Sequence, residues 1–251
     1  MKIAIDLRPL QVGHQDRGIG SYILNILKEI PTENIEYIIL RYSKSDPVKD
    51  YSINFGKEYK DVVVVHNKFG RSPKELILYI KDLMFPVHNK LRMYRPNIYI
   101  QFDYLFGAPR LLNCKTYVVA YDLIPFKLKN LYLPSWKKFI YFRQLRIRSR
   151  LRQSVRAFFY EHKYRKALKF LRRANGVISI SNSTTKDLIE IAKVKSKNIN
   201  TIYLAASFRE SEKDLFLRDI IKNLVDDIDG NFITFIGGTD KRRQVTELIS
   251  A

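Results

Sequence analysis

Cysteine and histidine are scarce in this chain: there is one cysteine, Cys114, and there are four histidines among 251 residues. Disulfide scaffolds need paired cysteines and zinc clusters need several closely spaced Cys or His ligands, so both classes are excluded. No segment approaches the roughly 18–20 uninterrupted apolar residues that span a bilayer. The N-terminus, MKIAIDLRPL, reads as a strand and lacks the apolar region and cleavage site of a signal peptide. We therefore expect a soluble, cytoplasmic protein.

Acidic residues are also few relative to basic ones. The sequence has 25 Asp and Glu against 45 Lys and Arg, a formal net charge of +20. This excess predicts an acidic partner, which is nucleic acid, an anionic membrane surface or a phosphorylated substrate. The apolar fraction of 46 % and the aromatic fraction of 13 % exclude a disordered basic tail and predict a packed core.

Short apolar runs typical of buried strands alternate with longer helical patterns along most of the chain. Helical spacing of apolar residues extends from Tyr22 to Ile30 and from Leu76 to Met84. The alternation predicts an α/β, Rossmann-like, doubly wound fold with a mainly parallel sheet that is covered on both faces. The predicted strands are Ile3–Asp6, Tyr37–Leu40, Val62–Val65, Ile98–Ile100, Tyr117–Ala120, Val177–Ile180 and Ile202–Leu204.

The C-terminal part departs from this pattern. An acidic stretch at 225–230 precedes a new strand at Phe232–Ile236, a Gly-Gly turn and a helix that starts near Val245. One strand and one helix start cannot bury their own apolar faces. We interpret residues 1–228 as one domain and 229–251 as the opening of a second, truncated domain. A last strand added to the edge of the first sheet is the alternative.

Two predicted loops lie at the carboxyl ends of strands, the edge where open α/β sheets bind ligands. Gly18 and Gly20 follow the first strand and lead into a helix, where glycines let the backbone approach a phosphate or sugar. They lack the third glycine of the dinucleotide fingerprint, and a structural turn explains them equally well. Asp122, after Tyr121, can accept hydrogen bonds from sugar hydroxyls or polarise a reacting group. Alternatively, Asp122 caps the loop before Pro125.

A third loop at this edge is rich in hydroxyl groups. Ser181 and Ser183 follow the strand Val177–Ile180 and precede a helix. Their side chains fit helix caps, and Thr184 with Asp187 resembles a capping box. Capping is compatible with lining the same cleft. By contrast, the D-x-D spacing at 227–229 lies in a polar linker, which disfavours a metal site there.

Residues 134–175 interleave basic with aromatic side chains, and Glu161 is the one acid between Lys137 and Arg173. Such a segment fits an anionic membrane interface, where each Lys or Arg contributes about 1 kcal/mol. Nucleic acid would use the same charges, and a solvated basic face would use none. The candidate membrane-binding residues are Trp136, Lys137, Lys138, Arg143, Arg146, Arg148, Arg150 and Arg152.

Taken together, five segments resemble the GT4-type glycosyltransferases, retaining enzymes of the GT-B fold with two Rossmann-like domains. The resemblance covers the whole chain, as that family's acceptor-binding N-terminal domain plus the first strand and helix start of its donor-binding domain. Tyr121 stands where the family has His, and the family's E-x7-E motif would fall beyond Ala251. The segments are Ile3–Asp6, Arg17–Gly20, Tyr121–Pro125 (in place of HDLIP), Ser181–Leu188 and Gly237–Gln244 (in place of GGTDPRKN).

The resemblance implies transfer of a sugar from a GDP- or UDP-linked donor, with no cofactor and no metal bound by a D-x-D motif. It places Asp122 beside the reacting sugar as the catalytic residue. Arg242 and Arg243 would neutralise the departing diphosphate, whose charge must be stabilised in the transition state. The implied donor- or acceptor-binding residues are Gly18, Gly20, Tyr121, Ser181, Ser183, Arg242 and Arg243.

The implied partners are a nucleotide-sugar, a lipid-linked saccharide acceptor, the anionic inner face of the cell membrane and a second chain that supplies the donor domain. The chain would be peripheral at the cytoplasmic face, inactive alone, and would serve synthesis of a bacterial surface polysaccharide such as O-antigen or capsule. Two other functions stay open: a non-catalytic module that binds membranes or partners, and a nucleic-acid-binding α/β protein.

Overall fold

The chain forms two compact units, Met1–Leu204 and Ala205–Ala251. In the second unit, the helix α11 (Val245–Ser250) is described. The predicted domain boundary after residue 228 lies outside the described residues and stays a prediction. The computed structural model describes residues 1–12, 15, 17–43, 45–56, 59–64, 88–107, 113–132, 147–204, 222 and 244–250.

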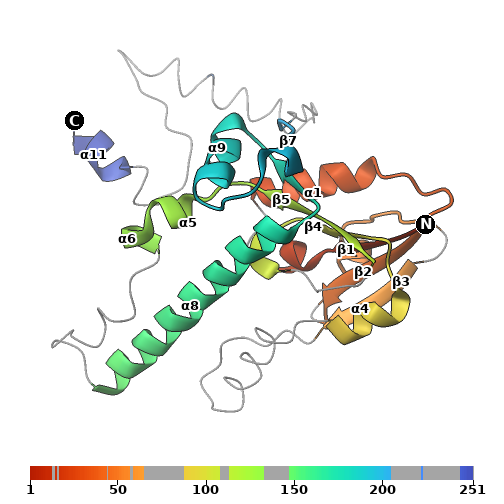
Figure 1. Cartoon of the computed structure of the whole chain (residues 1–251), viewed down its shortest axis with the longest axis horizontal. Coiled ribbons are helices and arrows are strands. Elements are labelled where there is room, and N and C mark those ends of the chain that lie inside the picture. Colours follow the sequence, from red (N-terminus) through yellow and green to blue (C-terminus); the bar gives the residue numbers. More distant parts are fainter. Residues whose placement is uncertain are drawn as a thin grey trace. The chain divides into compact units, whose positions relative to one another are not determined.

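Seven strands in the described part of the first unit form one parallel sheet, in the order β3-β2-β1-β4-β5-β6-β7 (Figure 1). The order grows outward in both directions from β1 and β4, as a doubly wound fold requires. The predicted α/β, Rossmann-like parallel architecture is therefore confirmed. The strands are β1 (Lys2–Asp6), β2 (Glu36–Tyr42), β3 (Tyr59–Val64), β4 (Ile98–Gln101), β5 (Lys115–Ala120), β6 (Gly176–Ser179) and β7 (Ile199–Thr201).

Helices cover both faces of the sheet, and this explains the continuous apolar runs of the central strands. On one face, α1 (Gly18–Lys28) buries Ile23 and Leu27 against Ile5 of β1. On the other face, α4 (His88–Tyr94) buries Leu91 in the same cluster as Ala4. In Figure 1, α1 and α4 accordingly lie on opposite sides of the sheet.

The long helix α8 (Ile147–Arg173) is anchored at its C-terminal end. Ala167 and Leu171 are buried in a cluster with Val118 of β5 and Val177 of β6. Phe158, further toward the helix N-terminus, is 49 % exposed, and Figure 1 shows this part of α8 extending away from the sheet. The remaining helical elements are η1 (Arg8–Gln11), α2 (Pro47–Asp50), η2 (Tyr104–Phe106), α5 (Ile124–Lys127), α6 (Lys129–Tyr132), α9 (Asn182–Glu190) and η3 (Ser196–Asn198).

The predicted strand at Ile202–Leu204 is wrong in position. The strand β7 occupies Ile199–Thr201, and the three apolar residues after it are exposed. The backbone N–H of Ile202 still donates to the carbonyl of Ser179 at 2.8 Å. Beyond Ser179 the neighbouring chain turns into α9, so Tyr203 and Leu204 have no strand to pair with among the described residues.

Other predictions differ in their bounds or lie outside the described residues. The strand β3 starts at Tyr59, three residues before the predicted start, and β6 ends at Ser179. The predicted helix at Leu76–Met84 and the predicted strand at Phe232–Ile236 lie outside the described residues. Among the helices that are described, none has both the length and the apolar character needed to cross a bilayer.

Candidate binding site at the carboxyl edge of the sheet

The sheet changes direction between β1 and β4. The chain adds β2 and β3 on one side of β1, and then adds β4 to β7 on the other side. The connections on either side of such a point run over opposite faces, so a crevice opens at the carboxyl ends of the two strands. The residues that leave β1, β4, β5 and β6 at this edge therefore form the candidate site.

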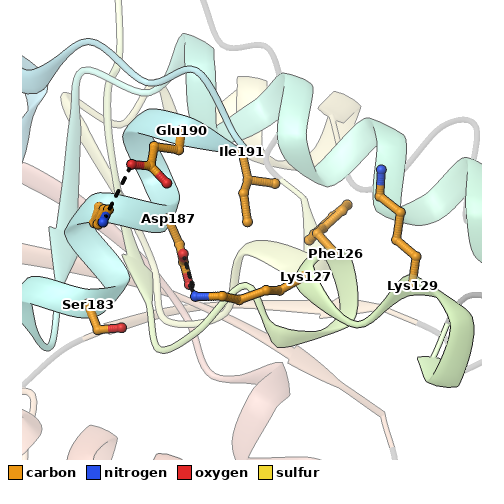
Figure 2. Close-up of a pocket in the computed structure, with 8 residues that line it drawn as sticks. Phe126, Lys127, Lys129, Ser183, Asp187, Glu190 and Ile191 are labelled. Atoms are coloured by element: carbon orange, nitrogen blue, oxygen red, sulfur yellow. Dashed lines mark hydrogen bonds and ion pairs between the residues drawn. The ribbon is translucent and has the colours of Figure 1, made fainter.

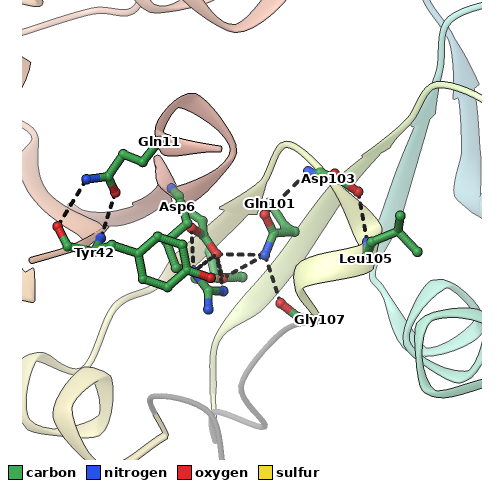
Figure 3. A network of polar contacts seen from close by, with 9 residues as sticks. Asp6, Gln11, Tyr42, Gln101, Asp103, Leu105 and Gly107 are labelled. Carbon is green, nitrogen blue, oxygen red and sulfur yellow. Dashed lines mark hydrogen bonds and ion pairs between the residues drawn. The ribbon is translucent and has the colours of Figure 1, made fainter. Parts of the chain in front are cut away.

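Asp6, the last residue of β1, is the centre of a buried hydrogen-bond network (Figure 3). Its carboxylate accepts from Arg8 through the backbone N–H at 3.0 Å and through Nε at 2.9 Å. It also accepts from Tyr99 Oη and from Gln101 Nε2, both at 2.8 Å. Asp6 pairs in register with Gln101, which puts the two side chains on one face. The carboxylate oxygens are therefore saturated, and Asp6 acts as a positioning group.

Arg8 is the cation that Asp6 holds in place. Burial alone would lower its pKa, but the adjacent Asp6 carboxylate raises the pKa above its usual value. The guanidinium carbon lies 5.3 Å from the ring centre of Phe106 and 5.8 Å from that of Tyr42. Within the described residues, Nη1 makes no hydrogen bond. Arg8 is thus a fixed positive charge with one donor edge left over.

Gln11 ties this turn to the end of β2. Its Nε2 donates to the carbonyl oxygen of Tyr42 at 3.0 Å, and its Oε1 accepts from the Tyr42 N–H (Figure 3). Its Nε2 also donates to the carbonyl oxygen of Ser45 at 2.8 Å. A side chain that bridges two main-chain segments in this way fixes their relative position. The turn that carries Arg8 is therefore held at both ends.

Asp103 and Lys163 add a second pair of opposite charges. Asp103 follows β4, and its Oδ1 accepts from the Leu105 N–H at 2.9 Å and thereby caps η2. Lys163 of α8 places Nζ 5.8 Å from the ring centre of Phe106. Burial lowers the pKa of Lys163, Asp103 opposes that shift, and Arg8 adds to it. The edge of η2 is therefore flanked by two cations.

The two glycines of the first loop differ in their surroundings. A Cβ at Gly20 would lie 2.0 Å from the carbonyl oxygen of Gln15, so the close approach of the loop requires glycine there. A Cβ at Gly18 would meet nothing within 4 Å. Arg17, the N-cap residue of α1, provides no side-chain cap. Among the described residues, Gly18 therefore has open space beside it, and no N-cap side chain accepts from the first turn of α1.

Tyr121, after β5, carries a buried polar atom that has no partner in the described part of the chain. Its ring packs edge-on against Tyr22 of α1, with ring centres 5.5 Å apart. Its Oη is buried and makes no hydrogen bond within the described part of the chain. Burial raises the pKa of this hydroxyl, and Tyr22 and Asp103 raise it further. An unsatisfied hydroxyl of this kind costs about 1–3 kcal/mol.

Asp122 caps its own loop while keeping one oxygen available. Its Oδ1 accepts from the Ile124 N–H at 3.1 Å, as the loop-capping interpretation expects. Its backbone carbonyl accepts from Tyr104 Oη at 2.9 Å. Within the described residues, Oδ2 makes no hydrogen bond. The capping role therefore leaves the carboxylate able to accept a hydrogen bond from a ligand.

The loop after β6 is joined to the loop after β5. Ser181 Oγ accepts from the Thr184 N–H at 3.1 Å, and Thr184 Oγ1 donates to the carbonyl of Tyr121 at 2.9 Å. The proposed capping box of Thr184 with Asp187 is wrong, because the helix begins one turn earlier and Ser181 is its N-cap. Asp187 instead pairs with Lys127 at 3.1 Å.

Ser183 is exposed on α9 and lines a separate pocket of about 850 Å³ beside α5 and α6 (Figure 2). Its lining contains two ion pairs, Lys127–Asp187 at 3.1 Å and Lys186–Glu190 at 3.9 Å. The pocket and the Asp6 network share no residue, so the structure does not bring Ser183 together with that network. The lining residues are Phe126, Lys127, Lys129, Ser183, Lys186, Asp187, Glu190 and Ile191.

Several predicted site residues stay predictions. Arg242, Arg243 and the D-x-D segment at 227–229 lie outside the described residues, as do Trp136, Lys137, Lys138, Arg143 and Arg146. Arg148, Arg150 and Arg152 lie on the described backbone of α8, and their side chains are outside the description. Among the described residues, no three His, Cys, Asp or Glu side chains are grouped as a metal site would need.

Sequence reasoning missed the polar network around Asp6. It noted Asp6 within a strand but did not assign Arg8, Gln101, Asp103 or Lys163 to the site. For Arg8 and Gln101 a signal was present, because charged and amide residues at the carboxyl end of an apolar strand are rarely placed there by packing alone. Nothing in the local sequence links Lys163 to them.

Comparison with known proteins adds little to this geometry. No family model and no curated protein matches the chain. A glycosyltransferase from Rickettsia africae ESF-5 is 14 % identical, with a TM-score of 0.40 over 89 % of this chain and 49 % of that one. Arabidopsis thaliana UGT89C1 complexed with UDP-L-rhamnose is 12 % identical, with a TM-score of 0.44 over 93 % of this chain and 58 % of that one. The N-terminal domain of Candida albicans trehalose-6-phosphate phosphatase is 12 % identical, with a TM-score of 0.43 over 90 % of this chain and 54 % of that one.

This chain therefore spans about half the length of the solved chains that it resembles. Likeness at this level carries no argument about function. The fold follows from the strand order and pairing of the chain itself.

Proposed function

We propose that this chain is the acceptor-binding half of a glycosyltransferase that moves a sugar from a nucleotide-sugar to a lipid-linked saccharide. The observation that carries the proposal is the buried hydroxyl of Tyr121 at the carboxyl edge of the sheet, which has no hydrogen-bond partner among the described residues. A buried hydroxyl is rarely left unsatisfied, and a sugar hydroxyl supplies the missing partner. Edge-on packing against Tyr22 holds the ring in place for that contact.

The neighbouring groups suit glycosyl transfer. Transfer requires that an acceptor hydroxyl lose its proton and that the negative charge of the leaving diphosphate be stabilised. Asp122 Oδ2 is available to accept a hydrogen bond from the acceptor. The open first turn of α1 at Gly18 and the fixed charge of Arg8 supply donors for anionic groups. A GDP- or UDP-linked donor and the retaining, GT4-type mechanism are part of this proposal.

Membrane association is a further part of the proposal. The net charge of +20 and the basic sequence of 134–175 favour docking at the anionic inner face of the cell membrane, where a lipid-linked acceptor is presented. The product would be a bacterial surface polysaccharide, and the donor domain would come from a second chain or a further part of the same protein.

The test is ligand binding by the 251-residue chain, measured as a saturable rise in Tm. Short prenyl-diphosphate-linked saccharides serve as acceptors, and UDP-, GDP- and dTDP-sugars serve as donors. We expect an acceptor to stabilise the chain. We also expect Tyr121→Phe and Asp122→Asn each to weaken its binding about tenfold, as the loss of one hydrogen bond to a ligand predicts.

Asp50→Asn is the matched control, because Asp50 is exposed on α2, which follows β2, and β1 and β4 separate β2 from β5 in the sheet. Its acceptor binding should be unchanged. Absence of saturable stabilisation by every acceptor and donor would overturn the proposal. Equal weakening in Asp122→Asn and Asp50→Asn would also count against it, because it would point to general charge effects.

A further inference from the structure

Two cations lie beside one aromatic ring near the point where the sheet changes direction. The guanidinium carbon of Arg8 is 5.3 Å from the ring centre of Phe106, and Nζ of Lys163 is 5.8 Å from the same centre. The three residues come from different elements: η1, η2 and α8. Two positive charges that lie beside the same ring repel each other. The convergence of Arg8 and Lys163 on Phe106 therefore needs an explanation.

Both cations have unused hydrogen-bonding capacity. Within the described residues, Nη1 of Arg8 and Nζ of Lys163 make no hydrogen bond, although Arg8 is only 5 % exposed. Burying a charge without such bonds is costly, and a bound anion would remove that cost. Asp6 neutralises Arg8, and Asp103 is close enough to Lys163 to influence its pKa. An anion therefore meets a pair of donors in a poorly hydrated environment, where charge-assisted bonds are strong.

The guanidinium of Arg8 and the helix that carries Lys163 are also fixed before any ligand arrives. Arg8 is fixed by its bonds to Asp6, and Lys163 projects from the part of α8 that Ala167 and Leu171 anchor in the core. Arg8 then loses little side-chain entropy on binding, which favours a specific site over a loose patch.

We propose that Arg8 and Lys163 form an anion subsite that binds a phosphate group of the substrate. A phosphate presents several oxygens around one centre and can accept from two donors on separate elements at once. The identity of the whole substrate rests on the proposed function, but the phosphate subsite does not. The phosphate belongs either to a nucleotide or to a prenyl diphosphate, and the two share this chemistry.

Inorganic pyrophosphate is the first probe, because it contains neither sugar nor lipid. Its binding to the 251-residue chain is measured by isothermal titration calorimetry at 150 mM salt, which screens non-specific attraction to the net charge of +20. We expect saturable binding that Lys163→Gln weakens at least about tenfold, because a charge-assisted hydrogen bond is lost. UDP and farnesyl diphosphate are then titrated, and the tighter of the two identifies the source of the phosphate.

Lys169→Gln is the matched control, since Lys169 lies on the same helix and is exposed. It should change pyrophosphate affinity less than twofold. Asp103→Asn should strengthen binding several-fold, because it removes a negative charge near Lys163 and keeps an oxygen that can cap η2. A misfolded variant cannot produce such a gain.

Two results would overturn the subsite: no saturable pyrophosphate binding, or equal losses in Lys163→Gln and Lys169→Gln. The outcome is independent of the acceptor test. Pyrophosphate binding that depends on Lys163, in a chain that binds no saccharide, leaves the subsite in place and removes the proposed function. A chain that binds the saccharide acceptor but not pyrophosphate would keep the proposed function and remove the phosphate subsite.

Discussion

Asp6 and Tyr121 lie at the same edge of one sheet, at the ends of β1 and β5, and differ in how their polar atoms are satisfied. Asp6 is fully buried and accepts from Arg8, Tyr99 and Gln101. The hydroxyl of Tyr121 is also buried and has no partner within the described residues. A saturated group has no capacity for a ligand and serves the fold, whereas an unsatisfied group costs stability unless a ligand completes it. The comparison thus separates residues that build the site from residues that use it.

Asp6→Ala should have the largest effect on the free energy of unfolding, and it tests the saturated group of the comparison. Removing the carboxylate leaves the buried guanidinium of Arg8 without its counter-charge. Breaking a buried pair in this way costs about 3–5 kcal/mol of unfolding free energy. Urea unfolding followed by circular dichroism measures the loss.

The control is an exposed ion pair, Arg165–Glu161, in which the Arg165 side chain is 76 % exposed. Glu161→Gln should cost at most about 0.5 kcal/mol, because water screens such a pair. If Asp6→Ala cost no more than Glu161→Gln, the Asp6 network would not hold this edge together.

Gly20→Ala should have the next largest effect, and Gly18→Ala is its matched control. The new Cβ at residue 20 would collide with the Gln15 carbonyl, so backbone must shift at a cost of about 1–3 kcal/mol. The Cβ at residue 18 has open space, and its stability should change by less than about 1 kcal/mol. Thermal unfolding of the two variants gives the difference. Equal losses would mean that the loop does not approach α1 as closely as the structure has it.

Tyr121→Phe tests the unsatisfied group of the comparison, and its effect on the free energy of unfolding should have the opposite sign to that of Asp6→Ala. It removes a buried hydroxyl that has no described partner, so unfolding free energy should rise by about 1 kcal/mol while ligand binding falls. Chemical unfolding without ligand, beside the acceptor titration, measures both. A loss of stability would show that the hydroxyl has a partner in the folded chain, and the central observation would fail.

Local sequence patterns predicted the sheet well because they record burial. The apolar runs at Ile3–Asp6 and Tyr37–Leu40 lie in β1 and β2, since central parallel strands are buried on both faces. The same rule failed at Ile202–Leu204, where an edge strand ends because its neighbour ends. Whether a neighbouring strand is present to pair with depends on the whole sheet, and a local sequence pattern does not record it.

The part of the site that consists of loops at the carboxyl ends of strands was predictable from the sequence. The loops that hold Gly18, Tyr121 and Ser181 were placed at the carboxyl edge from the strand pattern, and the structure places them there. The convergence of Arg8 with Lys163 was not predictable, because 155 residues of sequence separate two side chains that α8 brings to one ring.

Ser181→Ala should have the smallest of these effects, and it tests the link between the loops after β5 and β6. Ser181 Oγ satisfies the Thr184 N–H, and the Thr184 hydroxyl in turn holds the carbonyl of Tyr121. Loss of an N-cap costs about 1 kcal/mol, whereas Ser183→Ala at an exposed position should cost less. Thermal unfolding compares the two variants. Because Thr184 keeps its own bond to the Tyr121 carbonyl, acceptor binding should survive in both. Binding that fell in Ser181→Ala as far as in Tyr121→Phe would show that the cap, rather than the free hydroxyl, shapes the site.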